Sequence, residues 1–206
     1  MKITKQHIDN AKKPTGEMGI KTLERMNHSH ENLTNWALSF LTIEKPNKVL
    51  DIGCGGGATI KRLFNKYAQS FIYGIDYSHE SIQLSKLTNE DILNKSCEIS
   101  WGDVHELAYE DETFDVITAF ETVYFWNDLS KALSEVNRVL SENGEFLICC
   151  ESSNSQNEVW QDVLGELRIF SAQEWKSILE NNNFNVKKIR AENEWICLIC
   201  SKKLND

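Results

Sequence analysis

The stretch VLDIGCGGGA, residues 49–58, decides the fold of this chain. A β-branched and aliphatic run leads through Asp51 into a turn, 53–57, in which four of five residues are glycine, and a helical pattern over 58–68 follows at once. A turn without side chains lets the backbone approach a ligand closely, and the next helix aims its N-terminal amides at that ligand. A purely structural turn is the alternative, but four glycines carry a conformational entropy cost. The stretch therefore predicts a strand, a ligand-binding turn and a helix.

Taken alone, this glycine turn fits two kinds of nucleotide cofactor. Gly53, Gly55 and Ala58 satisfy the dinucleotide fingerprint G-x-G-x-x-G/A, which is typical of nicotinamide-binding enzymes. Asp51, followed by Gly53, Gly55 and Gly57, gives the pattern D-x-G-x-G-x-G instead. The turn by itself leaves both interpretations open.

Short β-branched runs alternate with helical patterns, as expected of a parallel sheet covered by helices on both faces. Five strands are predicted by KVLDIG (48–53), SFIYGID (70–76), CEISWGD (97–103), FDVITAFE (114–121) and EFLICCE (145–151). Two more, 184–190 and 194–201, are joined by the short link AEN, which favours an antiparallel hairpin. The expected fold class is α/β: a three-layer α/β/α sandwich around a doubly wound, mostly parallel seven-stranded sheet with a C-terminal antiparallel hairpin.

Helices are predicted over 80–94 and 129–141, the second stopped by a Glu-Asn-Gly turn at 142–144. Ser171 with Glu174 three residues later forms a capping box that predicts another helix start. The chain is expected to be one domain over 19–206, preceded by a loose N-terminal arm at 1–18. Within the domain, we expect a helical lid over 19–44 and a Rossmann-like core over 45–201.

Two acids follow the next strands along the chain. Asp76 ends the second predicted strand, where a carboxylate can accept hydrogen bonds from a ribose diol. Asp103 ends the third, where a carboxylate can accept from the exocyclic amine of an adenine. Either acid alone has a structural alternative as a helix cap or turn residue. With Asp51, however, three acids lie on the edge of the sheet where open α/β folds bind ligands.

With these residues in place, the sequence resembles the class I, seven-stranded S-adenosylmethionine-dependent methyltransferases, over roughly residues 45–201. The strings that carry the resemblance are VLDIGCGGG (49–57), YGIDYS (73–78), GDVHELAYEDETFD (102–115) and EVNRVLSENGEFLI (135–148). The final pair of strands also matches the terminal hairpin of that family. A nicotinamide enzyme is not expected to carry the third and fourth strings.

The resemblance implies a cofactor, S-adenosyl-L-methionine, and a role for each matching position. The turn Gly53–Gly57, which contains Cys54 and Gly55, would hold the amino-acid end of the cofactor, with Asp51 behind it. Asp76 would bind the ribose hydroxyls. The product left after methyl transfer would be S-adenosyl-L-homocysteine.

The same resemblance implies contacts to the adenine and to the reactive sulfur. Tyr77 would flank the adenine, Asp103 would take its amine, and the backbone amide of Val104 would read the ring edge. Ala119–Glu121, at the end of the fourth strand, would pass beneath the sulfonium. A methyl sulfonium is already a good electrophile, so the main task of the protein is to align the acceptor in line with the methyl carbon.

The acceptor is expected above the ends of the fourth and fifth strands. Glu121 stands where a carboxylate can face the sulfonium or a cationic acceptor. Tyr124, Phe125 and Trp126 can form an aromatic wall, although packing of the next helix onto the sheet is the alternative for these rings. Glu121, Tyr124 and His30 are the candidate catalytic residues, and Glu151, Trp160 and Arg168 are candidates for the pocket border.

The predicted lid, 19–44, contributes His30 as a candidate general base, with a surface or capping histidine as the alternative. Trp36 belongs to a helical apolar stripe and is expected in the core. His28 and His30 are not expected to bind a metal, because no carboxylate or cysteine cluster lies near them in the sequence. No metal site is predicted.

The composition of the chain limits the classes of partner that we expect it to bind. The formal charge of −9 disfavours nucleic acid, and the apolar runs are too short to cross a bilayer, so no membrane partner is expected. The six cysteines show no secreted disulfide framework, and Cys197 with Cys200 lacks the second ligand pair of a zinc site. We therefore expect a cytoplasmic protein with a small-molecule methyl acceptor, and a homodimer remains open.

The sequence thus predicts a methyltransferase that acts by in-line displacement. One alternative is an NAD(P)-dependent oxidoreductase, suggested by the formal dinucleotide fingerprint. The other is a non-catalytic S-adenosylmethionine-binding regulator, suggested by the absence of a certain catalytic base. The sequence specifies neither the acceptor nor the atom that is methylated.

Overall fold

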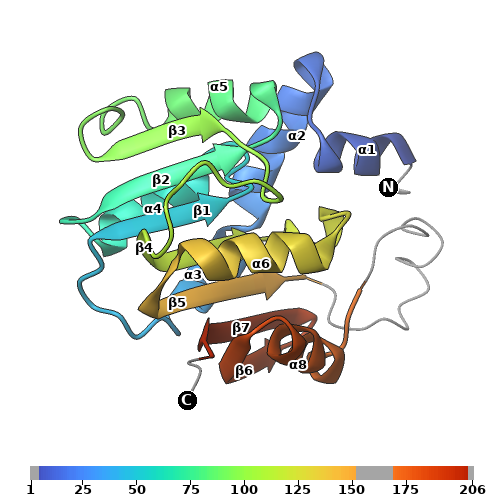
Figure 1. Ribbon diagram of the computed structural model, residues 1–206. Coiled ribbons are helices and arrows are strands. Elements are labelled where there is room, and N and C mark those ends of the chain that lie inside the picture. The colour runs from blue at the N-terminus through green and yellow to red at the C-terminus, as the bar shows by residue number, and fades with distance from the viewer. Residues whose placement is uncertain (1–4, 152–168, 204–206) are drawn as a thin grey trace.

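Figure 1 shows the computed structural model of the chain, which describes residues 5–151 and 169–203. These residues contain a seven-stranded sheet in the order β3-β2-β1-β4-β5-β7-β6. Adjacent strands among β1 to β5 pair in parallel. Strand β7 pairs antiparallel with both β5 and β6. The bounds are β1 Lys48–Ile52, β2 Phe71–Asp76, β3 Cys97–Trp101, β4 Phe114–Phe120, β5 Leu140–Cys150, β6 Phe184–Glu192 and β7 Trp195–Lys202. The expected fold class is confirmed.

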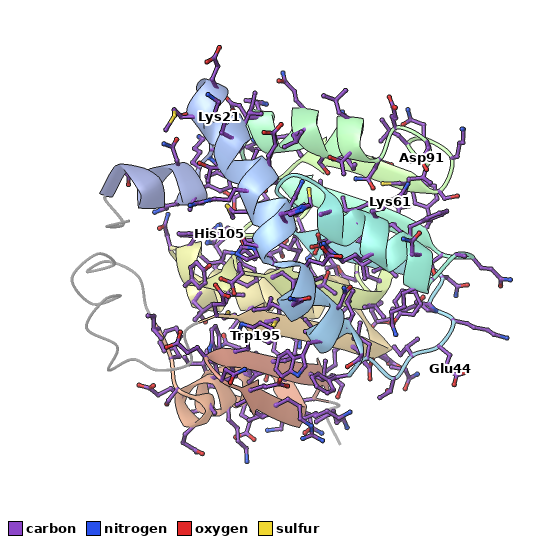
Figure 2. The ribbon with its side chains drawn as sticks, turned by 180° about the vertical axis from the view of Figure 1, so that it is seen from behind. Lys21, Glu44, Lys61, Asp91, His105 and Trp195 are labelled. Atoms are coloured by element: carbon purple, nitrogen blue, oxygen red, sulfur yellow. The ribbon has the colours of Figure 1, made fainter. Side chains whose placement is uncertain are left out.

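The helices cover both faces of this sheet. Helices α6 and α8 pack on one face, visible in front in Figure 1, through a core that includes Leu133 and Trp175. Helices α3, α4 and α5 pack on the other face, seen from behind in Figure 2. The helices are α1 Lys5–Lys12, α2 Gly16–Ser29, α3 Glu31–Leu38, α4 Ala58–Lys66, α5 His79–Thr88, α6 Leu129–Val139 and α8 Ala172–Asn181, with a 3₁₀ turn η1 at Val123–Phe125.

Two element boundaries differ from the sequence prediction. Helix α5 ends at Thr88 rather than at 94, because the side chain of Asn89 donates to the carbonyl of Ser85 at 2.9 Å and to that of Gly57 at 3.0 Å. The predicted turn at 142–144 lies inside β5, which begins directly after α6. Phe114 pairs with Leu140 and Val116 with Glu145, so the residues between form a bulge rather than a separate turn.

The N-terminal segment also differs from the loose arm that we expected. It contains α1 and the start of α2, and it is attached to the beginning of α5. The hydroxyl of Ser78 donates to the carbonyl of Pro14 at 2.7 Å, and the amide of Gly16 donates to the Glu80 carboxylate at 2.9 Å. Such bonds between side chains and backbone carry no apolar periodicity, so the sequence pattern gave no sign of them.

The predictions for the start of α8 and for Trp36 are confirmed. Ser171 and Glu174 form the capping box at the start of α8, and Trp36 packs against Phe40 and Trp195 with ring centroids 5.0 and 5.7 Å away. All six cysteines are free and buried. Cys197 and Cys200 belong to the cores on opposite faces of the sheet and cannot share a metal. Within the described ranges, none of the helices combines the length and apolarity that a bilayer crossing requires.

Candidate active site

Two adjoining cavities open at the carboxyl ends of β1, β2 and β4. Cavity A holds about 710 Å³ of empty space, part of it open to solvent, and lies between the glycine turn and α2. Cavity B holds about 610 Å³ and lies beside the segment that follows β3. The residues that line both cavities are Lys12, Gly53, Asp76, Tyr77, Thr122 and Phe125. The two cavities therefore form one elongated site.

The glycine turn forms the wall between β1 and this site. Gly53 has a φ of +73°, and a Cβ there would overlap the side chain of Thr122. A Cβ on Gly56 would lie 2.5 Å from the amide nitrogen of Asn27, whose side chain donates to the Gly56 carbonyl at 3.0 Å. Helix α2 and the glycine turn therefore pack so closely that position 56 has room only for the hydrogen atom of a glycine. As a result, cavity A is lined there by backbone without side chains.

Asp76 is held in a fixed orientation at the junction of the cavities. One carboxylate oxygen accepts from the amide of Gly55 at 3.0 Å and the other from the amide of Ser78 at 2.9 Å. Burial raises the pKa of Asp76, and these amide hydrogen bonds work in the opposite direction. Asp76 therefore offers a pre-oriented acceptor to a ligand that reaches both cavities.

Three predicted cofactor residues lie behind the site rather than on its wall. Asp51 is buried, accepts from the hydroxyl of Thr118 at 2.7 Å and lines neither cavity. Burial raises the pKa of Asp51 to about 7. Ala119 is fully buried and also lines neither cavity. Gly57 begins α4 and faces Ser85 of α5, whereas Gly53, Cys54 and Gly55 do line cavity A.

Cavity B contains the predicted adenine contacts. Asp103 and Val104 line it, together with Tyr77. His105 donates to one oxygen of Asp103 through its amide at 2.9 Å and contacts the same oxygen through its ring nitrogen at 2.6 Å. Partial burial opposes ionisation of Asp103, but the hydrogen bonds from His105 lower its pKa. The second Asp103 oxygen is left for a ligand.

Helix α1 closes the outer side of both cavities. The hydroxyl of Tyr77 donates to the carbonyl of Lys12, and the ammonium of Lys13 lies 5.4 Å from the centre of the Tyr77 ring. Lys12 itself lines both cavities. The segment predicted as an arm is therefore part of the site.

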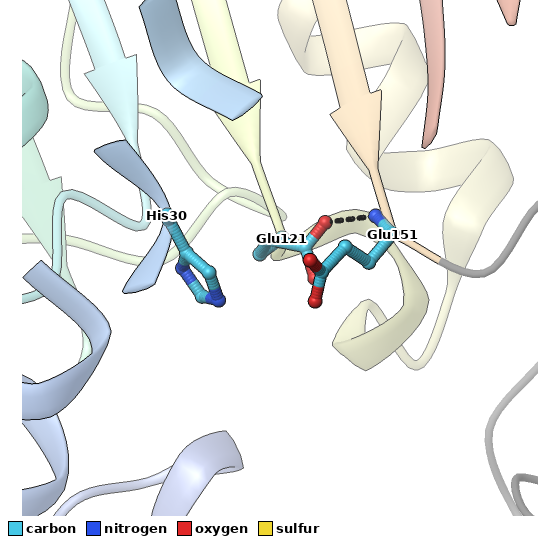
Figure 3. A group of neighbouring side chains, drawn as sticks. All are labelled: His30, Glu121 and Glu151. Atoms are coloured by element: carbon cyan, nitrogen blue, oxygen red, sulfur yellow. Dashed lines mark hydrogen bonds between the residues drawn. The ribbon is translucent and has the colours of Figure 1, made fainter. Parts of the chain in front are cut away.

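At the opposite end, Figure 3 shows His30, Glu121 and Glu151 facing one another. Glu121 follows β4 with a φ of +54°, and Glu151 follows β5. One oxygen of Glu121 accepts from the amide of Glu151, and the other accepts from the hydroxyl of Tyr124 at 2.8 Å. His30 lies between α2 and α3. We call His30, Glu121, Tyr124 and Glu151 the acceptor wall.

Burial controls the charge of this wall. It raises the pKa of Glu121 to about 7, against the hydrogen bonds from Glu151 and Tyr124, and it raises the pKa of Tyr124 as well. Burial lowers the pKa of His30, which keeps the imidazole neutral near pH 7. The wall therefore combines a neutral imidazole with a Glu121 carboxyl group whose pKa burial raises to about 7.

The predicted aromatic wall is divided between the two sides. Phe125 lines both cavities, and Trp126 lines cavity B and packs into the core. Tyr124 instead forms part of the acceptor wall, with its ring centroid 4.6 Å from that of Phe125. Of the border residues, Glu151 joins the wall, whereas Trp160 and Arg168 lie outside the described residues.

Thr122, Lys12 and Arg62 are among the lining residues that sequence reasoning missed. Thr122 is the neighbour that keeps Gly53 bare, Lys12 closes both cavities, and Arg62 lines cavity A while donating to the carbonyl of Asn27 at 3.3 Å. The position of Thr122 directly after Glu121 was a signal. Lys12 and Arg62 lie beside other basic residues, and nothing in their sequence context indicated that they belong to the site.

Comparison with known proteins places this site in a family. The profile of a family described as "Methyltransferase domain" matches residues 43–196. The uncharacterized methyltransferase YcgJ of Bacillus subtilis is 27% identical over 156 residues, which cover 71% of this chain and 60% of YcgJ. An O-methyltransferase of Pyrenophora dematioidea is 26% identical over 185 residues, covering 84% of this chain and 68% of the relative.

Among solved structures, a SAM-dependent methyltransferase from Aquifex aeolicus superimposes with a TM-score of 0.74 at 18% identity, covering 88% of this chain and 97% of that one. A likeness at this identity concerns the fold. The family profile spans most of the chain, although the match reaches only 60% of the length of YcgJ. The chain therefore belongs to the methyltransferase domain family, the class I S-adenosylmethionine-dependent methyltransferases.

Proposed function

We propose that the chain binds S-adenosylmethionine across cavities A and B and transfers its methyl group to a small-molecule acceptor. The observation that carries this proposal is the continuous site in which a bare glycine turn, Asp76 and Asp103 follow one another along the carboxyl edge of the sheet. The glycine turn would hold the amino-acid end, Asp76 the ribose hydroxyls, and Asp103 with the Val104 amide the adenine. Tyr77 would flank the ring.

The residues present fit this cofactor. A Cβ on Gly53 or Gly56 would collide with Thr122 or Asn27, so the turn presents bare backbone where it lines cavity A. The carboxylate of Asp76 is already oriented by two backbone amides, so binding a diol costs little further ordering. The family assignment also argues against the nicotinamide alternative.

When bound, the cofactor supplies a methyl group on a cationic sulfur, which leaves as a neutral thioether. The protein then has to hold the acceptor in line and keep water away, and orientation of this kind can lower a barrier by roughly 7–11 kcal/mol. We propose that Glu121 and His30 contact the acceptor, because they line cavity A away from the adenine side. Tyr124 lines neither cavity, so we propose that it acts through its hydrogen bond to Glu121. A small acceptor is supported by the modest size of the cavities.

Calorimetric titration of the purified chain with S-adenosylmethionine, S-adenosylhomocysteine and NAD tests the cofactor assignment. We expect both sulfur nucleosides to bind and NAD not to bind. A metabolite screen that detects release of S-adenosylhomocysteine then tests transfer. Binding of NAD alone would overturn the proposal, and binding of the sulfur nucleosides without turnover on any acceptor would favour the regulator alternative.

A further inference from the structure

The acceptor wall contains a set of metal-ligating atoms that the sequence did not reveal. His30 comes from the junction of α2 and α3, Glu121 from the end of β4 and Glu151 from the end of β5. One ligand atom from each lies within 4.8 Å of the other two. Figure 3 shows the imidazole facing the two carboxylates across open space. We expected no carboxylate cluster near His30 to complete a metal site, but the fold brings Glu121 and Glu151 beside it.

Neither carboxylate of this trio forms an ion pair with a side chain that the structure describes, although Arg25 and Arg62 lie near His30. Six ion pairs occur among residues 5–151 and 169–203, and none includes Glu121, Glu151 or His30. The partners of Glu121 are an amide and a phenol, which donate hydrogen bonds but carry no positive charge. Arg62 donates to the carbonyl of Asn27 rather than to either carboxylate. Two carboxylates this close repel each other unless a cation or a proton lies between them.

Each ligand atom remains available for coordination. A carboxylate offers about four lone-pair positions, so both Glu121 oxygens keep one after accepting their hydrogen bonds. Glu151 accepts from the indole nitrogen of Trp195 at 3.3 Å through one oxygen, which leaves the other for a ligand. Neither ring nitrogen of His30 has a hydrogen-bond partner among the described residues. Tyr124 and Trp195 orient the two carboxylates, as outer partners of metal ligands do.

We propose that His30, Glu121 and Glu151 bind one divalent first-row transition-metal cation of the Mn²⁺ or Fe²⁺ kind. One imidazole nitrogen with two carboxylate oxygens suits these borderline cations better than Mg²⁺ or Ca²⁺, which prefer oxygen alone. Bonds of about 2.0–2.2 Å place two ligands of one metal at most about 4.4 Å apart. Only two ligands on opposite sides of the ion reach that distance, so the three atoms, which lie within 4.8 Å of one another, have to draw closer together around the ion.

Three protein ligands leave coordination positions open toward cavity A, which His30 and Glu121 line. On the proposed methyltransferase function, those positions would take the oxygen of a hydroxyl acceptor. Coordination lowers the pKa of such a hydroxyl, so its proton passes to water, the oxygen forms a bond to the methyl carbon, and the electron pair of the breaking bond stays on sulfur. The substrate class is therefore an acceptor with a metal-binding hydroxyl group.

Metal binding can be tested on the full chain without a known acceptor. The protein is stripped with a chelator, and free Mn²⁺ is followed by its electron paramagnetic resonance signal during titration, with Co²⁺ absorption as a second probe. We expect one ion per chain. Glu151→Gln and His30→Ala should each weaken binding by about tenfold or more. Glu142→Gln is the matched control, because Glu142 is an exposed carboxylate on β5.

Thermal unfolding of every variant shows whether lost binding reflects lost folding, and a loss of Mn²⁺ affinity at an unchanged midpoint supports the site. Absence of both Mn²⁺ and Co²⁺ binding to the wild-type chain would overturn the proposal. So would binding that Glu151→Gln and His30→Ala leave unchanged, which would mean an adventitious ion only. Binding of S-adenosylhomocysteine to the metal-stripped protein is measured in a separate titration. If the cofactor binds but no metal does, only the metal site is refuted, so failure of the metal site and failure of the methyltransferase function are distinguishable.

Discussion

The cofactor side and the acceptor side of the site differ in the groups that form them. The cofactor side consists of a bare glycine turn and of an Asp76 carboxylate that two backbone amides orient. The acceptor side consists of the side chains of His30, Glu121 and Glu151, which lie far apart in the sequence. The residues of the glycine turn are contiguous in the sequence, whereas the side chains of the acceptor wall come together only when the chain folds. The cofactor side should therefore tolerate little change in shape, and the acceptor side little change in charge.

The largest effect is expected at Asp51, which supports the glycine turn from behind. Its pKa is raised to about 7 in the folded chain from an ordinary value of 3.8, so the folded state holds a proton that the unfolded state has lost. The resulting stability is fully present below about pH 4 and is lost as the pH rises toward 7. At 1.36 kcal/mol per pKa unit, the loss is about 4 kcal/mol.

Urea unfolding of the wild type and Asp51→Asn at pH 4.5, 6 and 7.5 measures this loss. The difference between the two proteins isolates Asp51 from the other buried acids. We expect the variant to gain relative stability as the pH rises. A constant difference across the three pH values would show that Asp51 is ionised throughout.

On the acceptor side, Glu121→Gln should reduce turnover by about a hundredfold or more, since it removes one of the two carboxylates of the wall while keeping its shape. Affinity for S-adenosylhomocysteine should change little. The measurement is transfer of labelled methyl with the acceptor found by the screen, with Glu142→Gln as the control. An equal loss of cofactor affinity and of turnover would mean that the two sides are not separable.

On the cofactor side, Gly53→Ala should weaken binding of S-adenosylhomocysteine by about a hundredfold, because an alanine at a φ of +73° is strained and its Cβ overlaps Thr122. Gly16→Ala is the matched control. Gly16 has a φ of +59°, but a Cβ there would meet nothing within 4 Å. Calorimetric titration compares the two, and equal losses would show that backbone strain alone, rather than the shape of the cradle, is responsible.

Asp76→Ala should cost about 1.5–3 kcal/mol of cofactor affinity, the scale of a charge-assisted hydrogen bond. Asp91→Ala, which removes an exposed carboxylate paired with Lys61 at 2.6 Å, serves as the control. Titration with S-adenosylhomocysteine measures both variants. Unchanged affinity in Asp76→Ala would remove Asp76 from the proposed binding site.

The fold, and the gathering of the glycine turn, Asp76 and Asp103 at one edge of the sheet, could be predicted because those features depend on local patterns. Strand periodicity, the glycine turn and the acids at strand ends each lie within a few residues, and parallel strands bring their carboxyl ends to one edge. Ala119 and Gly57, which we expected to bind the cofactor, line neither cavity, since alternation along a strand and the close packing of α4 on α5 decide which atoms face the cavity.

The acceptor wall and the N-terminal closure could not be predicted in the same way. His30 was identified only as an isolated candidate, and its proximity to Glu121 and Glu151 depends on how α2 and α3 pack against the sheet. Helix α1 is attached through backbone carbonyls of Lys12 and Pro14, which any residue type can offer. Such contacts leave no trace in composition or periodicity.

The smallest effect is expected at Tyr77, which lies between the cofactor side and α1. Tyr77→Phe removes the hydroxyl that donates to the Lys12 carbonyl but keeps the ring that lines both cavities. Loss of one such bond costs about 0.5–1.5 kcal/mol, so affinity for S-adenosylhomocysteine should fall by about two- to tenfold. Because the bond holds a covering helix rather than the ligand, the loss should appear as faster release in stopped-flow measurements. Tyr109→Phe is a control on a tyrosine of the core outside both cavities. Slower association with unchanged release would contradict a covering role for α1, and would limit the cofactor side to the sheet edge alone.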